Sequence, residues 1–223
     1  MLIELVCCSV DDCEEAKAGG AHRVELCHAI ELGGLTPSLG LLMEAQKVGL
    51  PLMVMIRPRG GGFCLSESEF LVMQRDLEIV ASHAPVGVVF GVLKEDSLID
   101  VVRMGILLRQ AEGLQTVFHR AFDRTPDPFE SLEQLIDLGV TRVLTSGHAP
   151  TALDGAESLK MLCERACGRI EVLAGGAIRP ANVKQVVSRS TVSQVHAGLF
   201  RDSEDGARVV DRGAVEAMRR ALV

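Results

Sequence analysis

Short apolar runs alternate with longer segments of helical periodicity along the whole chain. The runs are rich in Val, Ile and Leu, as expected for parallel strands that are buried on both faces. We count eight strand-helix pairs, the number that closes a (β/α)8 barrel. The predicted strands are Ile3 to Cys8, Arg23 to Cys27, Leu52 to Arg57, Val86 to Leu93, Leu114 to Phe122, Arg142 to Ser146, Ile170 to Gly175 and Gln194 to Gly198.

Helix start signals support the same organisation. Ser66 with Glu69 forms a capping box, and Asp127 followed by Pro128 gives a cap and a proline at the first helical position. The chain has 223 residues, 48% of them hydrophobic, and no low-complexity linker divides it. A doubly wound sheet usually carries a GxGxxG turn after its first strand, which is lacking here. We therefore predict an α/β protein with one domain over residues 1–223, a TIM-like (β/α)8 barrel.

Polar residues at the carboxyl ends of the strands are the candidate site residues, because the active sites of such barrels lie at that end. Side chains alternate between the two faces of a strand, so we assign one parity of each strand to the barrel interior. The acids Glu4, Glu25 and Asp123 are expected to face arginines, since buried charges are costly unless paired. The predicted partners are Arg57, Arg59 and Arg120.

Arginines and glycines at several strand ends predict an anion-binding site. Two arginines and three glycines follow the strand at Leu52, and two more glycines end the strand at Ile170. Main-chain N–H groups of such loops commonly hold phosphate. Solvated arginines on a glycine-rich hairpin are the alternative for the first loop, and relief of crowding is the alternative for the second. The predicted anion-binding residues are Arg57, Arg59, Arg120, Ser146, Gly175, Gly176 and His196.

Proton transfer is the chemistry that the remaining polar groups suggest. Histidine exchanges protons near neutral pH, and His119 and His196 both end strands on the inward parity, beside Glu25. We predict Glu25, His119 and Asp123 as catalytic residues. A core histidine bonded to a main-chain carbonyl is the alternative for either histidine, and for His196 taken alone it is favoured.

Charge and cysteine content limit the partners and the compartment. The net charge is −7 and no basic run is present, so we expect neither nucleic acid nor a membrane as partner. Seven cysteines in a chain without an export signal predict reduced thiols and a cytoplasmic location.

Cys8 and Cys27 end neighbouring predicted strands on the inward parity, which would bring two thiolates within reach of one soft metal ion. Thiolates select Cu(I) among the metals available to proteins. A buried cysteine is more often a small hydrophobic residue, and the chain has no CxxC spacing, so the packing role stays open.

Five ordered motifs resemble those of the CutC family of cytoplasmic copper homeostasis proteins. They are Val24-Glu25-Leu26-Cys27, Gly33 to Ser38, Ile56 to Cys64, Phe118 to Asp123 and Val143 to Gly147. The resemblance covers nearly the whole chain and implies a TIM-like barrel, a homo-oligomer and a role in copper handling. The cysteines that match the family are Cys8 or Cys7, Cys27 and Cys64. The chain departs from the family after the eighth strand, where Val195 to Phe200 leads quickly to Asp211 in place of a longer polar loop, and this shortening affects one wall of the pocket.

Two functions follow as expectations. The first is copper homeostasis of the CutC type, with Cu(I) as a bound ion at Cys8 and Cys27. The alternative is a lyase or isomerase that acts on an anionic, phosphorylated or carboxylated small molecule at the carboxyl end of the barrel. A barrel mouth without any remaining activity is the third possibility, because this fold hosts too many chemistries to decide among them.

Overall fold

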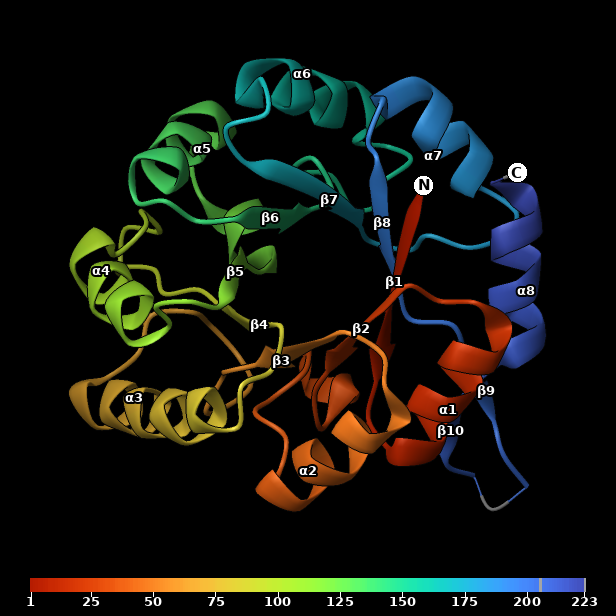
Figure 1. Cartoon of the computed structure of the whole chain (residues 1–223). Helices are drawn as coiled ribbons and strands as arrows, with labels where there is room; N and C mark the ends of the chain where they lie inside the picture. The colour runs from red at the N-terminus through yellow and green to blue at the C-terminus, as the bar shows by residue number, and fades with distance from the viewer. Residues whose placement is uncertain (205, 223) are drawn as a thin grey trace.

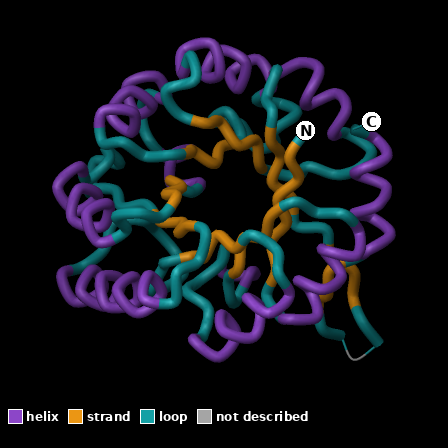
Figure 2. Tube along the Cα trace, in the orientation of Figure 1, coloured by secondary structure: helices purple, strands orange, loops and turns teal. Residues whose placement is uncertain are grey.

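Eight parallel strands form a closed barrel in the computed structural model, which describes residues 1–204 and 206–222. Each strand pairs with the next one in the chain, and the first strand pairs with the eighth. Helices surround the strands as an outer ring (Figures 1 and 2). The predicted TIM-like (β/α)8 fold is therefore confirmed. The strands are β1 (Leu2–Cys7), β2 (Arg23–Leu26), β3 (Leu52–Met55), β4 (Gly87–Phe90), β5 (Gln115–Phe118), β6 (Arg142–Thr145), β7 (Glu171–Gly175) and β8 (Gln194–Ala197).

The helices of the ring begin at the expected caps. The Ser66 side chain and Glu69 form the predicted capping box, and Asp127 caps a helix whose first residue is Pro128. In the described part of the chain, no helix is both long enough and apolar enough to cross a membrane. The helices are α1 (Val10–Gly19), α2 (Leu39–Val48), α3 (Glu67–Ser82), α4 (Val101–Gln110), α5 (Pro128–Asp137), α6 (Ala156–Ala166), α7 (Val183–Ser190) and α8 (Arg212–Ala221), with short 3-10 helices η1 (Ile30–Leu32) and η2 (Arg120–Arg124).

The alternation of side chains divides the core into two parts. One parity of each strand packs against the helices and forms the larger apolar cluster. The other parity points into the barrel, as the strand period of two requires. The apolar residues of this inner cluster are Val6, Cys27, Met53, Met55, Val89, Val117, Leu144 and Leu173.

Three strands end two or more residues earlier than the sequence pattern predicts, and one of them is β4, which ends at Phe90 rather than Leu93. β5 ends at Phe118 rather than Phe122, because the His119 side chain caps η2 by accepting a hydrogen bond from the main-chain N–H of Ala121. Arg120 and Asp123 therefore lie on a helical turn. β3 ends at Met55, so Arg57 and the residues after it lie on a loop. The alternation of side chains between the two faces therefore ends with β3 and β5. It does not determine where the arginines after these strands point.

The segment after β8 forms an antiparallel hairpin that the sequence pattern does not predict. Its strands are β9 (Phe200–Asp202) and β10 (Arg208–Val210), and the hairpin lies next to α1 (Figure 1). The Asp12 carboxylate on α1 accepts a hydrogen bond from the N–H of Val210 at 2.7 Å. Phe200 packs against the inner apolar cluster of the barrel. This short segment thus contributes one side chain next to the barrel interior.

Candidate functional site

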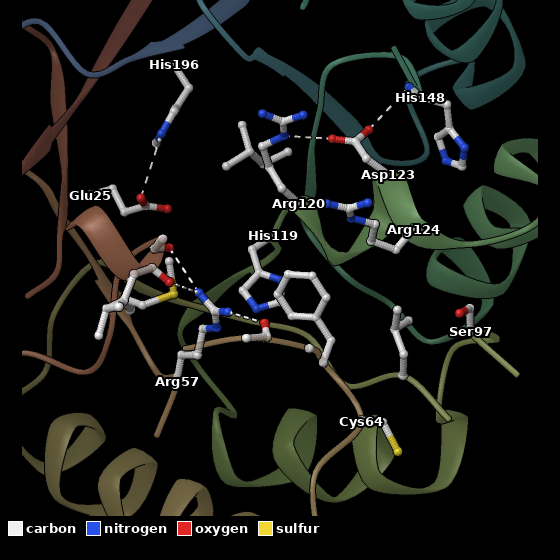
Figure 3. A pocket seen from close by; sticks show the side chains of 18 of the residues that line it. Glu25, Arg57, Cys64, Ser97, His119, Arg120, Asp123, Arg124, His148 and His196 are labelled. Atoms are coloured by element: carbon white, nitrogen blue, oxygen red, sulfur yellow. Dashed lines mark hydrogen bonds and ion pairs between the residues drawn. The ribbon is translucent and has the colours of Figure 1, made fainter. Parts of the chain in front are cut away.

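A cavity of about 1190 Å³ opens at the carboxyl ends of the strands (Figure 3). Several residues that the sequence predicts for the site line it together: Glu25, Arg57, His119, Arg120, Asp123 and His196. Further polar residues that line it are Lys94, Glu95, Ser97, Arg124 and His148. The local sequence signals for these residues are weak, because Arg124 follows Asp123 by one position and the others lie in loops.

His196 lies between two carboxylates inside the barrel. Its Nδ1 donates to Glu4 Oε1 at 2.8 Å, and its Nε2 lies 3.7 Å from Glu25 Oε2. Burial lowers the pKa of His196, but the charges of Glu25 and Glu4 outweigh it, and the pKa lies above 6.5. Burial raises the pKa of Glu4, yet His196 and Arg23 bring it down to about 2. Glu4 and His196 therefore form a buried ion pair.

Glu25 has a carboxylate oxygen without a partner. The residue is only 4% exposed, and no described residue forms a hydrogen bond with Oε1. Burial raises the pKa of Glu25 to about 7, with a smaller contribution from the charge of Glu4. Donor atoms of Glu4, Glu25 and His196 lie within 4.8 Å of one another, so the cluster has a spacing that a metal ion could bridge. Its oxygen and nitrogen donors are harder ligands than Cu(I) prefers.

The negative charge of Glu4 is paired with an arginine at the amino end of the strands, whereas the sequence pattern predicts an arginine at the carboxyl end. Arg23, at the start of β2, forms an ion pair with Glu4 and donates to Gln194 at 2.9 Å. Arg142 and Glu171 form the next pair around this end. The expected pairing of Glu4 with the arginines of the mouth is therefore wrong. The reason is the position of Glu4 along the barrel axis. The strand register places it opposite Arg23 and His196, away from the arginines of the mouth.

His119 is a buried and neutral histidine. It is 4% exposed, and burial followed by repulsion from Arg57 lowers its pKa to about 3. Its Nδ1 accepts from Ala121, so the ring proton is assigned to Nε2, for which no described residue is a partner. The Phe63 ring packs on the imidazole at a centroid distance of 4.9 Å. At neutral pH His119 can act as a hydrogen-bond donor to a ligand.

Arg57 and Arg59 use their guanidinium groups to hold loops. Arg57 donates to the carbonyls of Leu32, Gly33 and Gly61 at 3.1, 3.2 and 2.7 Å, and it stacks on Phe63. Arg59 forms an ion pair with Glu69 on α3, outside the barrel. Glu69 also completes the cap of that helix. Both arginines therefore join loops of the mouth to the scaffold.

Asp123 joins η2 to the loop after β6. It accepts hydrogen bonds from Arg120 Nε at 2.7 Å, from the hydroxyl of Thr145 and from the main-chain N–H groups of Ser146 and His148. Ser146 is fully buried and accepts a hydrogen bond from Arg120 Nη2 at 2.8 Å. This network fixes the guanidinium of Arg120 at the cavity wall. It also occupies most of the acceptor capacity of Asp123.

Gly175 and Gly176 lie behind the cavity wall. A Cβ atom at Gly175 would be 2.6 Å from Leu144 Cδ1, and one at Gly176 would be 3.0 Å from Ser146 Cβ. Gly176 also has a φ angle of +117°. Close packing and backbone conformation therefore explain both glycines, and in the described structure neither is among the residues that line the cavity.

Cys8 and Cys27 lie side by side, with their sulfur atoms 3.7 Å apart. The hydrogen bond with Cys27 lowers the pKa of Cys8, while the bond with Cys8 and burial raise the pKa of Cys27. Cys27 belongs to the inner cluster with Met53 and Met55, and Cys8 packs against that cluster. Cys64 is exposed and lines the cavity. The predicted pair of neighbouring thiols is thus present, and Cys27 shares the inner cluster with two thioethers.

Comparison with known proteins places these features in a family. The model of the CutC family matches residues 1–200. A CutC family protein of Treponema denticola is 43% identical over 204 residues, which cover 91% of this chain and 83% of the relative. One from Agrobacterium fabrum is 41% identical over 225 residues, 99% of this chain and 89% of the relative.

A solved structure is similar as well. The CutC protein of Streptococcus agalactiae, described provisionally as a copper homeostasis protein, is 33% identical, and the superposition has a TM-score of 0.84. The match covers 88% of this chain and 97% of that one. The family model ends at residue 200, where the β9–β10 hairpin begins. From the extent of these matches, the chain belongs to the CutC family.

Proposed function

We propose that this protein acts in copper homeostasis and holds Cu(I) between Cys8 and Cys27. The observation that carries the proposal is the distance of 3.7 Å between the two sulfur atoms. Membership of the CutC family supports it, since the similar protein from Streptococcus agalactiae is described in terms of copper homeostasis. Thiolates are the protein ligands that favour Cu(I) most strongly.

The surroundings of the two thiols fit a soft metal ion. The Met55 methyl group and the Cys27 sulfur both lie against Gly34, at 3.6 and 3.4 Å from the position of a Cβ atom there. A thioether is therefore close to the thiol pair, and thioethers also favour Cu(I). The seven cysteines are all free, as metal binding by thiolates requires. The cytoplasmic location and the homo-oligomer belong to the same proposal, and light scattering after size exclusion measures the latter.

Competition with a Cu(I) chelator under anaerobic, reducing conditions tests the copper proposal. The parent protein should take one Cu(I) from the chelator, and Cys8→Ser and Cys27→Ser should each abolish this transfer. Cys167→Ser is the matched control, because this thiol is exposed at the end of α6. Transfer that persists in the Cys8→Ser/Cys27→Ser double variant contradicts the proposal.

A second candidate function is acid–base catalysis on an anionic small molecule at the barrel mouth, as in a lyase or isomerase. The observation that favours it is the pair of unpartnered buried atoms, Glu25 Oε1 and His119 Nε2, on residues that line one cavity. Buried polar atoms normally have partners, so a ligand is the natural partner here. In this proposal Glu25 exchanges a proton with the ligand and His119 donates to its oxygen. His196, which is held by Glu4, lies beside Glu25 and positions it.

Deuterium uptake from D2O tests this second candidate. A panel of short-chain 2-oxo acids and sugar phosphates is incubated with the protein, and NMR follows exchange at carbon. Uptake by at least one compound is expected with the parent protein and with Glu112→Gln, an exposed control on the outer surface. Glu25→Gln should abolish the uptake. If no compound in the panel exchanges with the parent protein, the candidate is rejected.

A further inference from the structure

One side of the cavity is basic. Arg120 and Arg124 on η2 and Lys94 in the loop between β4 and α4 all line it. Figure 3 shows the guanidinium groups of Arg120 and Arg124 on the same side of the cavity, with Glu25 and His196 across from them. The cavity thus has a basic side near solvent and an opposite, buried side with Glu25.

The basic groups of this side keep hydrogen-bonding capacity for a ligand. Arg120 uses Nε on Asp123 and Nη2 on Ser146, yet its side chain is 42% exposed. Its Nη1 has no hydrogen bond with a described residue. Arg124 and Lys94 are exposed, and in the described chain no carboxylate lies within ion-pair distance of either. One guanidinium is therefore fixed in place, and two further cations line the same cavity.

The nearby carboxylates leave this side with positive charge. Asp123 is neutralised by Arg120 and receives further hydrogen bonds from main-chain N–H groups. Glu95 is exposed beside Lys94 and is the other acid at this rim. Three cations face two acids, one of which is already bound. Guanidinium groups match the geometry of phosphate oxygens, and a concave surface strengthens their field.

The buried side of the cavity offers hydrogen-bonding atoms to a ligand. Glu25 and His119 are each 4% exposed, and each has one polar atom without a partner in the described structure. Glu25 Oε1 accepts a hydrogen bond from a hydroxyl group, and His119 Nε2 donates one to a hydroxyl or carbonyl oxygen. A molecule that satisfies both sides has an anionic group at one end and an oxygen-bearing carbon chain at the other.

We propose that the mouth binds a small organic phosphate, with its phosphate group on Arg120, Arg124 and Lys94 and its oxygenated carbon chain directed to Glu25 and His119. This proposal rests on the second candidate function and adds its substrate class. It moves the anion subsite away from the loop at Gly175 and Gly176 and away from Arg57, whose guanidinium already binds main-chain carbonyls. Phosphate is favoured over carboxylate because it offers more acceptor oxygens to two guanidinium groups and an ammonium group, and because the three cations exceed the two acids of this side.

Calorimetric titration with inorganic phosphate, glycerol 3-phosphate and acetate tests the subsite. The parent protein should bind glycerol 3-phosphate more tightly than phosphate, and phosphate more tightly than acetate. The Lys94→Gln/Arg124→Gln double variant should weaken binding of both phosphates at least about tenfold, a loss of about 1.4 kcal/mol. Lys184→Gln/Arg189→Gln on α7 removes the same two charges from the outer surface and should leave binding unchanged.

Two further outcomes separate this inference from the function on which it rests. His119→Asn should remove the advantage of glycerol 3-phosphate over phosphate and keep phosphate binding, because it removes the Nε2 donor to the carbon chain, while the Asn side-chain oxygen can still cap η2 and leave the cations in place. If neither phosphate binds the parent protein, or if both bind the Lys94→Gln/Arg124→Gln variant equally well, the subsite is refuted. Deuterium uptake that depends on Glu25 and persists in that variant would refute the subsite alone and leave acid–base catalysis in place.

Discussion

His196 donates a hydrogen bond to Glu4 inside the barrel, and the two residues are register partners on neighbouring strands, β8 and β1. The pair is buried, and Arg23 holds the other oxygen of the same carboxylate. Removal of one member of such a pair leaves a buried charge without compensation. Its contribution to stability should therefore be measurable and dependent on pH.

The sign of this pH dependence follows from the two pKa shifts. The pKa of Glu4 falls from 4.5 to about 2, so its contribution is present above pH 4.5 and is lost as the pH falls toward 2. The pKa of His196 rises above 6.5, so its contribution is present below pH 6.5 and is lost as the pH rises through the shifted value. Glu4→Gln, His196→Asn and the double variant form a cycle, measured by urea unfolding. The coupling free energy should be about 1–3 kcal/mol at pH of about 5.5 and clearly smaller at pH of about 9. Equal coupling at both pH values would contradict the assignment.

The Cys8–Cys27 pair should form a disulfide under mild oxidation. The sulfur atoms need to approach from 3.7 Å to the bonded distance of about 2.05 Å, and the two residues end neighbouring strands. Diamide, a two-electron oxidant, should therefore remove two of the seven free thiols in the monomer. Peptide mapping should find Cys8 joined to Cys27, and Cys8→Ser should prevent the loss. Cross-links that involve mainly Cys64 or Cys167 would show that exposure, rather than proximity, controls oxidation.

Asp123→Ala should destabilise the protein by about 2–4 kcal/mol, because the change leaves the Arg120 guanidinium and the N–H groups of Ser146 and His148 without their acceptor. Urea unfolding measures this loss. Asp154→Ala is the control, since Asp154 is exposed and, among the described residues, its carboxylate accepts a hydrogen bond only from the nearby Thr151 hydroxyl. If the two variants lose similar stability, Asp123 is not the structural anchor that its contacts indicate.

Gly87→Ala should be destabilising by about 1–3 kcal/mol, because the added methyl group would overpack the barrel interior. A Cβ atom at Gly87 would lie 2.4 Å from the Gln115 carbonyl oxygen and 2.4 Å from Met53 Cε. Gly62→Ala is the matched control, since a Cβ atom there has no described neighbour within 4 Å. We expect that change to stay within about 0.5 kcal/mol. Thermal or urea unfolding of both variants provides the comparison.

The barrel and the inward parity of its strands could be predicted from sequence because both depend on short periods in the chain. Alternation over two residues was enough to place Glu25, Cys27 and Met55 on the inner face. The same reasoning brought Cys8 next to Cys27. The inward orientation of a side chain is a local property of its strand. The order of the strands then tells only which strands are neighbours in the barrel.

Charge pairing could not be predicted in the same way, because it depends on how far each strand is shifted along the barrel axis. Glu4 pairs with Arg23, which lies at the start of β2, rather than with an arginine after a strand end. The alternation of side chains also predicts nothing beyond the end of a strand. The helix η2 begins after His119 and carries Arg120 and Arg124 to the cavity. The strand pattern therefore does not identify Arg124 as a site residue.

Arg57 makes the two thiols of the Cys8–Cys27 pair differ in their access to solvent. Its guanidinium holds the carbonyls of Leu32 and Gly33, and the backbone at Gly34 then lies against the sulfur of Cys27. Cys27 is fully buried, whereas Cys8 is partly exposed. We therefore expect an ion or reagent from solvent to meet Cys8 before Cys27. Attachment to the pair would then be sequential, and its second step would depend on how readily Arg57 releases the loop.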